Sequence, residues 1–387
     1  MQEKRLEIGV LHGFRSIMVG LVVIFHIWQQ SWLPHYFNLF GLTLNIDFLA
    51  RTGFYFVDGM LLLSGFLLYL PYVQQEYVPI TVDSTARFYK KRVARIIPSY
   101  VFSLLIILFF FILPFHRFVN GSQLIADILA HLTFTFTFSP QTYIHTALNG
   151  SLWTLAIEMQ FYLFFPWILR LASKYRKQTL LSMFIVGFSY RIYVLLFVEQ
   201  KAMFINQLPA FLDVYALGML GAMAYCAIFY HVIPSLNQKN KNYFSLMALL
   251  VFVSSLYLIN ILMHYLANVG NAGPAAIHQA QLIWRFPLVL LLLLSMLSAS
   301  FMFKRVQKIL DNGFFRFLST ISLNVYIWHQ YLTVEMRIAF MPENFRENIN
   351  LQWAFTLLCY SVMLVVATIV TFGIEKPFSK LILRKEL

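Results

Sequence analysis

Apolar residues occur along this chain in long runs, each long enough to cross a bilayer as a helix. A spanning helix needs about 20 residues, which rise about 1.5 Å each. The pattern predicts about ten such spans, at residues 8–30, 54–74, 96–115, 151–172, 179–198, 208–230, 243–266, 281–303, 314–338 and 352–374. Residues 122–139 form a further candidate that Asp127 and His131 interrupt. We therefore expect an all-α transmembrane helix bundle, a single membrane domain over residues 1–387 without a separate soluble domain.

The distribution of Lys and Arg between the loops predicts the orientation, because basic residues collect in cytoplasmic loops. If there are ten spans and both termini are cytoplasmic, the outer loops contain only Arg51, Arg117, Lys201 and Arg346. Counting residues 122–139 as a span would move the basic segment 173–178 to the outer side. We therefore expect residues 122–139 to be peripheral or re-entrant on the outer side, where protein or water must cover irregular backbone.

Composition supports this class of protein. The chain is 60% hydrophobic and 12% charged, whereas soluble domains carry about 25% charged residues. The net charge of +13 is explained by the basic inner loops, so we expect no nucleic-acid partner. Cys226 and Cys359 lie in apolar runs and indicate neither a disulfide framework nor a metal site. The first apolar run is long, lacks a small-residue cleavage site and contains Arg15, so we expect no cleavable signal peptide.

Ionisable residues lie inside the first predicted span. Arg15 and His26 are 11 residues apart, which at about 100° per residue places them on nearly the same face, roughly 16 Å apart along the axis. His12 joins this face one turn earlier. An arginine inside a spanning helix costs on the order of 3 kcal/mol on insertion scales and is a functional-site candidate. The alternative is a buried ion pair that joins two helices.

Arg92 and Arg95 lie one turn apart in the basic segment RFYKKRVARIIPSY, residues 87–100. Two guanidinium groups at this spacing can bind the phosphates of one ligand. A positive-inside signal would produce the same cluster, so the segment alone leaves both interpretations open.

Carboxylates and a further histidine lie in other spans. Glu158 shares a helical stripe with aromatic residues, namely Phe161, Tyr162 and Phe165. Such a stripe is usually packing, but the carboxylate needs a cation from the first helix or a substrate as partner. Asp58 is expected near the outer end of the second span. His329 lies in an aromatic run, where an interhelical hydrogen bond is its commoner role.

Taken in order, these motifs resemble the integral-membrane acyltransferase 3 family, from Leu11 to Pro377. The matching residues are Gly13, Arg15, His26, Asp58, Ser64, Gly65, Phe66, Arg92, Arg95, Ile96, Pro98, Trp153, Glu158, Gln160, Phe161, Tyr162, Phe211, Gly218, Ser322, Tyr326, His329, Glu375 and Pro377. Two departures stand out. His12 replaces a usual acid, and Met60 and Leu61 replace paired phenylalanines.

The resemblance implies transfer of an acyl group, most often acetyl, from cytoplasmic acyl-coenzyme A to a hydroxyl, or less often an amine. The acceptor would be a glycan, a glycolipid or another molecule beyond a bacterial cytoplasmic membrane, reached directly or with a separate partner protein. Arg92 and Arg95, with Arg15, would bind the coenzyme A phosphates. His26 would act as general base or acyl acceptor, with Asp58 or Glu158 orienting it. No metal is expected.

Two other classes of function remain open at this point. A secondary transporter could use intramembrane Arg, His and Glu as a substrate or proton path, although the chain shows no internal repeat of the kind that transporters often have. A membrane scaffold or sensor would have little need for Arg15, His26 and Glu158 together. Binding of acyl-coenzyme A would separate an enzyme from both.

Overall fold

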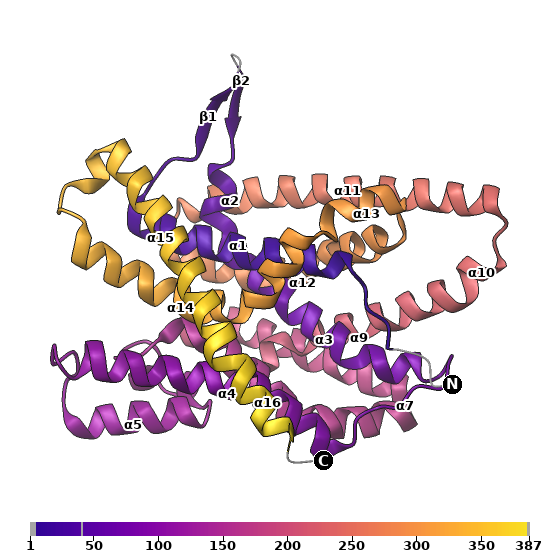
Figure 1. Cartoon of the computed structure of the whole chain (residues 1–387), viewed down its shortest axis with the longest axis horizontal. Helices are drawn as coiled ribbons and strands as arrows, with labels where there is room; N and C mark the ends of the chain where they lie inside the picture. The colour runs from indigo at the N-terminus through magenta and orange to yellow at the C-terminus, as the bar shows by residue number, and fades with distance from the viewer. Residues whose placement is uncertain (1–4, 40–41, 385–387) are drawn as a thin grey trace.

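The computed structural model describes residues 5–39 and 42–384, which form a bundle of long helices (Figure 1). The long helices are α1 (Val10–Ser31), α3 (Val57–Gln74), α4 (Thr85–Ile107), α7 (Trp153–Phe197), α9 (Leu212–Ala227), α11 (Gln238–Gly270), α12 (Pro274–Phe301), α14 (Gly313–Phe340) and α15 (Ile349–Val370). The short helices are α2 (Asp47–Thr52), α5 (Gly121–Leu132), α6 (Pro140–Tyr143), α8 (Lys201–Phe204), α10 (Ile233–Ser235), α13 (Lys304–Leu310) and α16 (Lys376–Leu383). Single 3-10 turns are η1 (Gly53–Phe56), η3 (Phe136–Phe138), η4 (Gly150–Leu152), η5 (Leu208–Phe211) and η7 (Phe345–Glu347), and π-helical turns are η2 (Leu108–Ile112), η6 (Ile228–Val232) and η8 (Thr371–Glu375).

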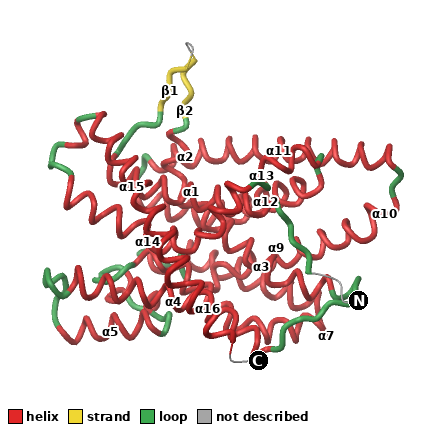
Figure 2. Tube along the Cα trace, viewed as in Figure 1, coloured by secondary structure: helices red, strands yellow, loops and turns green. Residues whose placement is uncertain are grey.

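A small β-hairpin projects from the bundle (Figure 2). Strands β1 (Tyr36–Leu39) and β2 (Leu42–Asn45) pair antiparallel, with Tyr36 opposite Asn45 and Leu39 opposite Leu42. The bundle is all-α as predicted, and the hairpin is an addition that the apolar pattern did not predict. Its strands are four residues each and pair only with one another in the described chain.

In the described residues, eight helices, counted with the turns that continue them, are long and apolar enough to cross a membrane. They are Val10–Ser31, Asp47–Gln74, Thr85–Ile112, Gly150–Phe197, Leu208–Ser235, Gln238–Gly270, Pro274–Phe301 and Ile349–Leu383. The predicted count of ten differs in two places. The spans 151–172 and 179–198 are counted together as the single segment Gly150–Phe197, which has a kink at Tyr175, and 314–338 is not among the eight.

The kink in α7 explains the first difference, because two helices joined there are counted as one segment, and two helices agree with the two predicted spans. The 45 residues of α7 would extend about 68 Å, more than twice the hydrocarbon core of about 30 Å. The backbone leaves helical geometry at Tyr175 (φ −133°, ψ 56°), between the two predicted spans. The second difference has a compositional cause, because α14 carries buried polar residues such as Ser322, Asn324 and His329. These residues lower its mean hydropathy and face the protein interior rather than lipid.

The segment 122–139 does not form one spanning helix. Helix α5 has 12 residues, about 18 Å, which is shorter than the bilayer core. The chain turns at Phe134, which has a positive φ of 58°, and continues through η3 and α6. This agrees with the prediction that the segment is not a simple crossing.

Close helix contacts position the helices that carry the site. The prominent pairs are α1 with α14, α3 with α9, and α14 with α15. Gly65 and Gly218 lie where α3 meets α9. A Cβ atom on Gly65 would lie 2.7 Å from the Tyr215 carbonyl oxygen, and one on Gly218 would lie 2.4 Å from the Leu62 carbonyl oxygen. Only glycine permits this backbone approach, which is typical of helix packing in membranes.

Ion pairs join the loops at one end of the bundle. Asp83 accepts hydrogen bonds from Arg5 (3.2 Å) and Lys91 (2.7 Å), and Arg176 pairs with Glu76. Partial burial acts to raise the pKa of Asp83, but the hydrogen bonds and charges of Arg5 and Lys91 outweigh it and lower that pKa. Helix α16 packs against α4, which begins just after Asp83. The two ends of the described chain therefore lie together, and we call this the inner end.

Candidate active site

A cavity of about 260 Å³, which we call the inner cavity, lies between α1, α3, α4, α7 and α14. Its charged and polar lining residues are Arg15, Ser64, Arg92, Arg95, Thr154, Glu158, Tyr162, Ser322 and Tyr326. Three arginines and one carboxylate line the same space, so the cavity carries a net positive charge. The sequence prediction that Arg15, Arg92 and Arg95 belong to one site is therefore matched by their positions.

Glu158 is bound by hydroxyl groups. Its Oε1 accepts hydrogen bonds from Ser64 Oγ at 2.7 Å and from the Tyr162 hydroxyl. Arg92 lies over the Tyr162 ring, with its guanidinium carbon 5.4 Å from the ring centroid, and its buried Nε has no hydrogen-bond partner among the described residues. Arg15 interacts with Glu158 at longer range. The Glu158 carboxylate therefore lies among the arginines of the inner cavity, and in the described chain it forms hydrogen bonds to hydroxyl groups and no ion pair with an arginine.

A larger cavity of about 700 Å³, which we call the outer cavity, lies on the other side of the bundle interior. Its lining includes His26 and Gln29 of α1, Asp58 of α3, residues 143–144, 146, 148–151 and 153 of the loop that leads into α7, and residues 326, 330, 331 and 334 of α14. Helix α1 therefore places Arg15 in one cavity and His26, about three turns further along the helix, in the other.

His26 is hydrogen-bonded to an amide and lies beside a second imidazole. Its Nδ1 is 2.9 Å from Gln29 Oε1, which makes Nδ1 the protonated nitrogen of the neutral ring and leaves Nε2 free to accept a proton. The rings of His26 and His329 have centroids 4.8 Å apart. His329 donates from Nδ1 to the Tyr326 carbonyl oxygen at 2.6 Å. The predicted interhelical role of His329 is thus replaced by a bond within its own helix.

Tyr326 lies at the junction of the two cavities and lines both of them. Its side chain is 4% exposed. The hydroxyl donates to the Ser151 carbonyl oxygen at 2.9 Å and accepts from Thr154 Oγ1. These contacts connect α14 to η4 and to the first turn of α7 at the point where the cavities meet.

The expectation that Asp58 or Glu158 orients His26 is not matched by the described contacts. Asp58 borders the outer cavity, but its Oδ2 pairs with Arg285 Nε at 3.3 Å. Arg285 also donates to the carbonyl oxygens of Ile205 and Ala210. The physical reason is that Arg285 on α12 is charged and only 1% exposed, so leaving it without a carboxylate would cost much free energy. A neutral imidazole carries no charge that needs such a partner.

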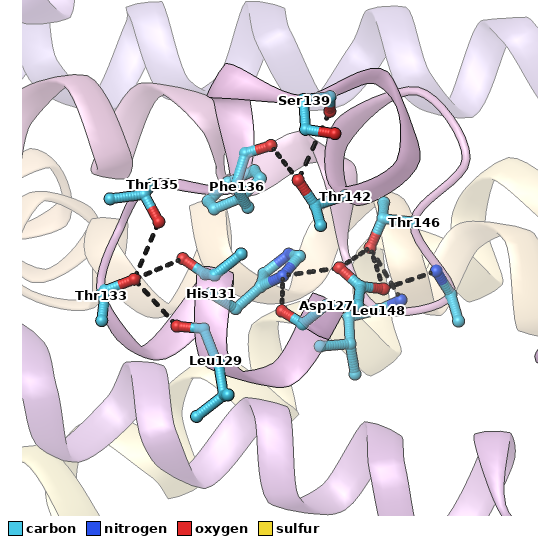
Figure 3. Close-up of polar contacts among 12 residues, drawn as sticks. Asp127, Leu129, His131, Thr133, Thr135, Phe136, Ser139, Thr142, Thr146 and Leu148 are labelled. Atoms are coloured by element: carbon cyan, nitrogen blue, oxygen red, sulfur yellow. Dashed lines mark hydrogen bonds and ion pairs between the residues drawn. The ribbon is translucent and has the colours of Figure 1, made fainter. Parts of the chain in front are cut away.

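Polar contacts join α5 to the loop between it and η4 (Figure 3), and this loop forms part of the wall of the outer cavity. The Asp127 carboxylate accepts from Thr146 Oγ1 at 2.8 Å and from the Ala147 backbone N–H at 2.9 Å. His131 Nδ1 lies 3.0 Å from Asp127 Oδ1. Asn149 Nδ2 donates to the Ile327 carbonyl oxygen at 3.0 Å, which joins this loop to α14. Asp127 and His131, which interrupt the apolar pattern, therefore position the loop.

Sequence reasoning missed two features of this site. Gln29, one turn after His26, gave no signal because a glutamine near a helix end is common. Tyr326 was recognised only as part of a motif, and its position between two cavities required the packing of α14 against α7. Among the described residues, no group of three or more His, Cys, Asp or Glu side chains could hold a metal ion.

The fold and the site together define a membrane protein whose interior holds a cationic cavity and a histidine-bearing cavity. The sequence pattern of the acyltransferase 3 family, described as "Acyltransferase domain", matches residues 8–372, so the chain belongs to this family. It is also 24% identical over 330 residues to "Putative acetyltransferase ORF330" of Acidianus two-tailed virus, covering 84% of this chain and 82% of the viral protein. No solved structure matches the chain. The protein is thus an integral-membrane acyltransferase.

Proposed function

We propose that this enzyme transfers an acyl group, in the first instance acetyl, from acyl-coenzyme A at the inner end to an acceptor hydroxyl on the outer side. One observation carries the proposal. The cavity with Arg15 and the cavity with His26 both border Tyr326. A donor entering from one side and an acceptor entering from the other would meet at this residue.

The inner cavity supports an anionic donor. Arg15, Arg92 and Arg95 face one carboxylate there, and guanidinium groups bind phosphates through charge-assisted hydrogen bonds. The pyrophosphate of coenzyme A would lie near Arg92 and Arg95, with its thioester arm directed towards Tyr326. The resemblance to the family contributes the identity of the donor, and the charge of the cavity is consistent with it.

The chemistry would take place at His26. Its Nε2 takes the proton of the acceptor hydroxyl while that oxygen attacks the thioester carbonyl carbon and forms a C–O bond. The C–S bond then breaks, and the departing coenzyme A thiolate takes up the proton from the imidazolium. Gln29 Oε1, bonded to Nδ1, keeps the required tautomer. A base of this kind typically contributes about 10²- to 10⁴-fold to the rate.

The outer cavity suits an acceptor with several hydroxyl groups, such as a glycan or glycolipid. Its lining offers the amide side chains Gln29, Asn149, Asn206, Gln281 and Gln330, each of which can both donate and accept. Amines are a less favoured acceptor class. We place the enzyme in a bacterial cytoplasmic membrane, where a separate outer partner protein could receive or present the acceptor.

The proposal is tested by binding of acetyl-coenzyme A to the detergent-purified protein, measured by titration calorimetry. The variants are Arg92→Ala/Arg95→Ala and His26→Ala. A matched control, Lys174→Ala/Lys177→Ala, removes two basic residues that border neither cavity. We expect saturable binding in the wild type, the control and His26→Ala, and at least tenfold weaker binding in the arginine variant.

Two outcomes would overturn the proposal. Absence of binding by the wild-type protein would favour a transporter, with Arg15, His26 and Glu158 as its path. Equal loss in the control and in the arginine variant would show that net inner charge, rather than the cavity, attracts the ligand.

A further inference from the structure

A groove at the inner end adjoins the inner cavity. This groove, which we call the vestibule, has a volume of about 440 Å³ and is lined by His12, Arg15, Arg95, Ser319, Thr320, Glu375, Lys376, Ser379 and Lys380. Arg15 and Arg95 line both the vestibule and the inner cavity. The two spaces therefore adjoin at these two arginines, and the inner cavity borders Tyr326 as well.

The cations of the vestibule are not engaged in close ion pairs within the part of the chain that the structure describes, although Arg95 and Lys376 interact electrostatically with Glu375 at longer range. Arg15, Arg95, Lys376 and Lys380 form no ion pair within 4.0 Å among the described residues, whereas other basic residues of the inner end are paired, namely Arg5, Lys91, Arg176 and Arg316. Lys376 Nζ lies 3.9 Å from the Phe372 ring centroid. The single acid of the vestibule, Glu375, accepts a hydrogen bond from Asn324 Nδ2 at 2.7 Å.

Helix α16 turns its basic residues towards the vestibule. Lys376, Ser379 and Lys380 follow the i, i+3, i+4 spacing of one helical face and line the groove. The opposite face carries Phe378 and Leu381, which are 50% and 60% exposed. A positive-inside signal requires only that lysines lie on the cytoplasmic side. It does not require that both lysines line a groove that also contains Arg15 and Arg95.

We propose that the vestibule binds the nucleotide end of coenzyme A, with Lys376 and Lys380 as ligands of its ribose 3′-phosphate. This inference rests on the proposed function. Coenzyme A carries a pyrophosphate and, separately, a 3′-phosphate on the adenosine ribose. The inner cavity would take the thioester arm, Arg92 and Arg95 the pyrophosphate, and the vestibule the adenosine and its phosphate. Four cations facing one acid match a ligand with this much negative charge.

The experiment compares binding of coenzyme A with that of 3′-dephospho-coenzyme A, which lacks only the 3′-phosphate. Both are titrated into wild type, Lys376→Ala/Lys380→Ala and Lys376→Arg/Lys380→Arg. Lys304→Ala/Lys308→Ala is the matched control, because it removes two inner-loop lysines that do not line the vestibule. We expect the wild type to bind coenzyme A about 10- to 100-fold more tightly than the dephospho form, as for a charge-assisted contact.

The alanine variant should bind both ligands with nearly equal, weakened affinity, while the arginine variant and the control keep the preference. Equal binding of both ligands by the wild type would refute a 3′-phosphate site while leaving the proposed function intact. A preference that survives in the alanine variant would place the 3′-phosphate elsewhere and overturn the assignment of the lysines. If the wild type binds neither ligand, the proposed function fails and this inference fails with it.

Discussion

Removing the Asp58 carboxylate should destabilise the protein strongly, because its partner Arg285 is almost completely buried. Arg285 is 1% exposed, and Asp58 is the one carboxylate that contacts it among the described residues. Asp58→Ala would leave the guanidinium with the carbonyl oxygens of Ile205 and Ala210 and the face of the Phe211 ring, at 3.9 Å. None of these neutralises its charge. Breaking a buried ion pair in this way costs about 3–5 kcal/mol.

The apolar double variant Asp58→Leu/Arg285→Met removes both charges and should recover most of this loss, to within about 1–2 kcal/mol of wild type. The free energy of unfolding would be measured by denaturant titration in mixed micelles for the wild type, both single variants and the double variant. A cost below about 1 kcal/mol for Asp58→Ala, or a double variant no more stable than the single ones, would refute the reasoning. Acyl transfer in native membranes should follow stability in this series, because His26 is bonded to Gln29 rather than to Asp58.

Three further predictions concern catalysis, the contact of Tyr326 with Ser151, and the pH dependence of stability. His26→Ala should lower acyl transfer by about 10²- to 10⁴-fold with unchanged acetyl-coenzyme A binding, and near-normal release of the coenzyme A thiol would contradict the assignment. Tyr326→Phe removes the hydroxyl that donates to the Ser151 carbonyl oxygen and should cost about 1–3 kcal/mol of unfolding free energy, whereas an unchanged value would show that the junction contact is dispensable. The pKa of Asp83 is lowered in the folded protein, so its stabilising effect is present above the ordinary value of about 3.9 and is lost as pH falls through the folded value. Wild type should therefore lose more unfolding free energy than Asp83→Asn between pH 6 and pH 3, and parallel pH profiles would contradict this.

Helical periodicity was sufficient to predict how Arg15 and His26 share one face of α1, because both lie on the same regular element. The arginine pair of α4 was likewise predictable from its spacing. The partners of these residues depend on which helices pack together, and sequence spacing carries no such information. For that reason the apolar pattern did not predict that Asp58 would pair with Arg285 on α12, or that Glu158 would bind Ser64 of α3.

The number of predicted spans was also affected by contacts between helices, which the sequence pattern does not contain. Residues 314–338 read as apolar enough to cross, yet Ser322, Asn324 and His329 are buried polar residues of α14. They are accommodated by contacts within the bundle, which an apolar count along one helix does not include. The hairpin of β1 and β2 was missed because its strands are short and pair only with each other in the described chain.

The hydrogen bonds of Tyr326 to Ser151 and Thr154 bear on whether ions could leak across the membrane through the cavities. The vestibule and the inner cavity share Arg15 and Arg95 in their linings, and the inner and outer cavities share Tyr326. Under the proposed function, the donor and acceptor spaces would meet at Tyr326, and the hydrogen bonds of its hydroxyl to Ser151 and Thr154 would help to keep them apart. The acyl group would then change compartment in the bond exchange itself. An alternating-access motion of whole helices would not be needed, and ions would remain separated while a single chemical group passes.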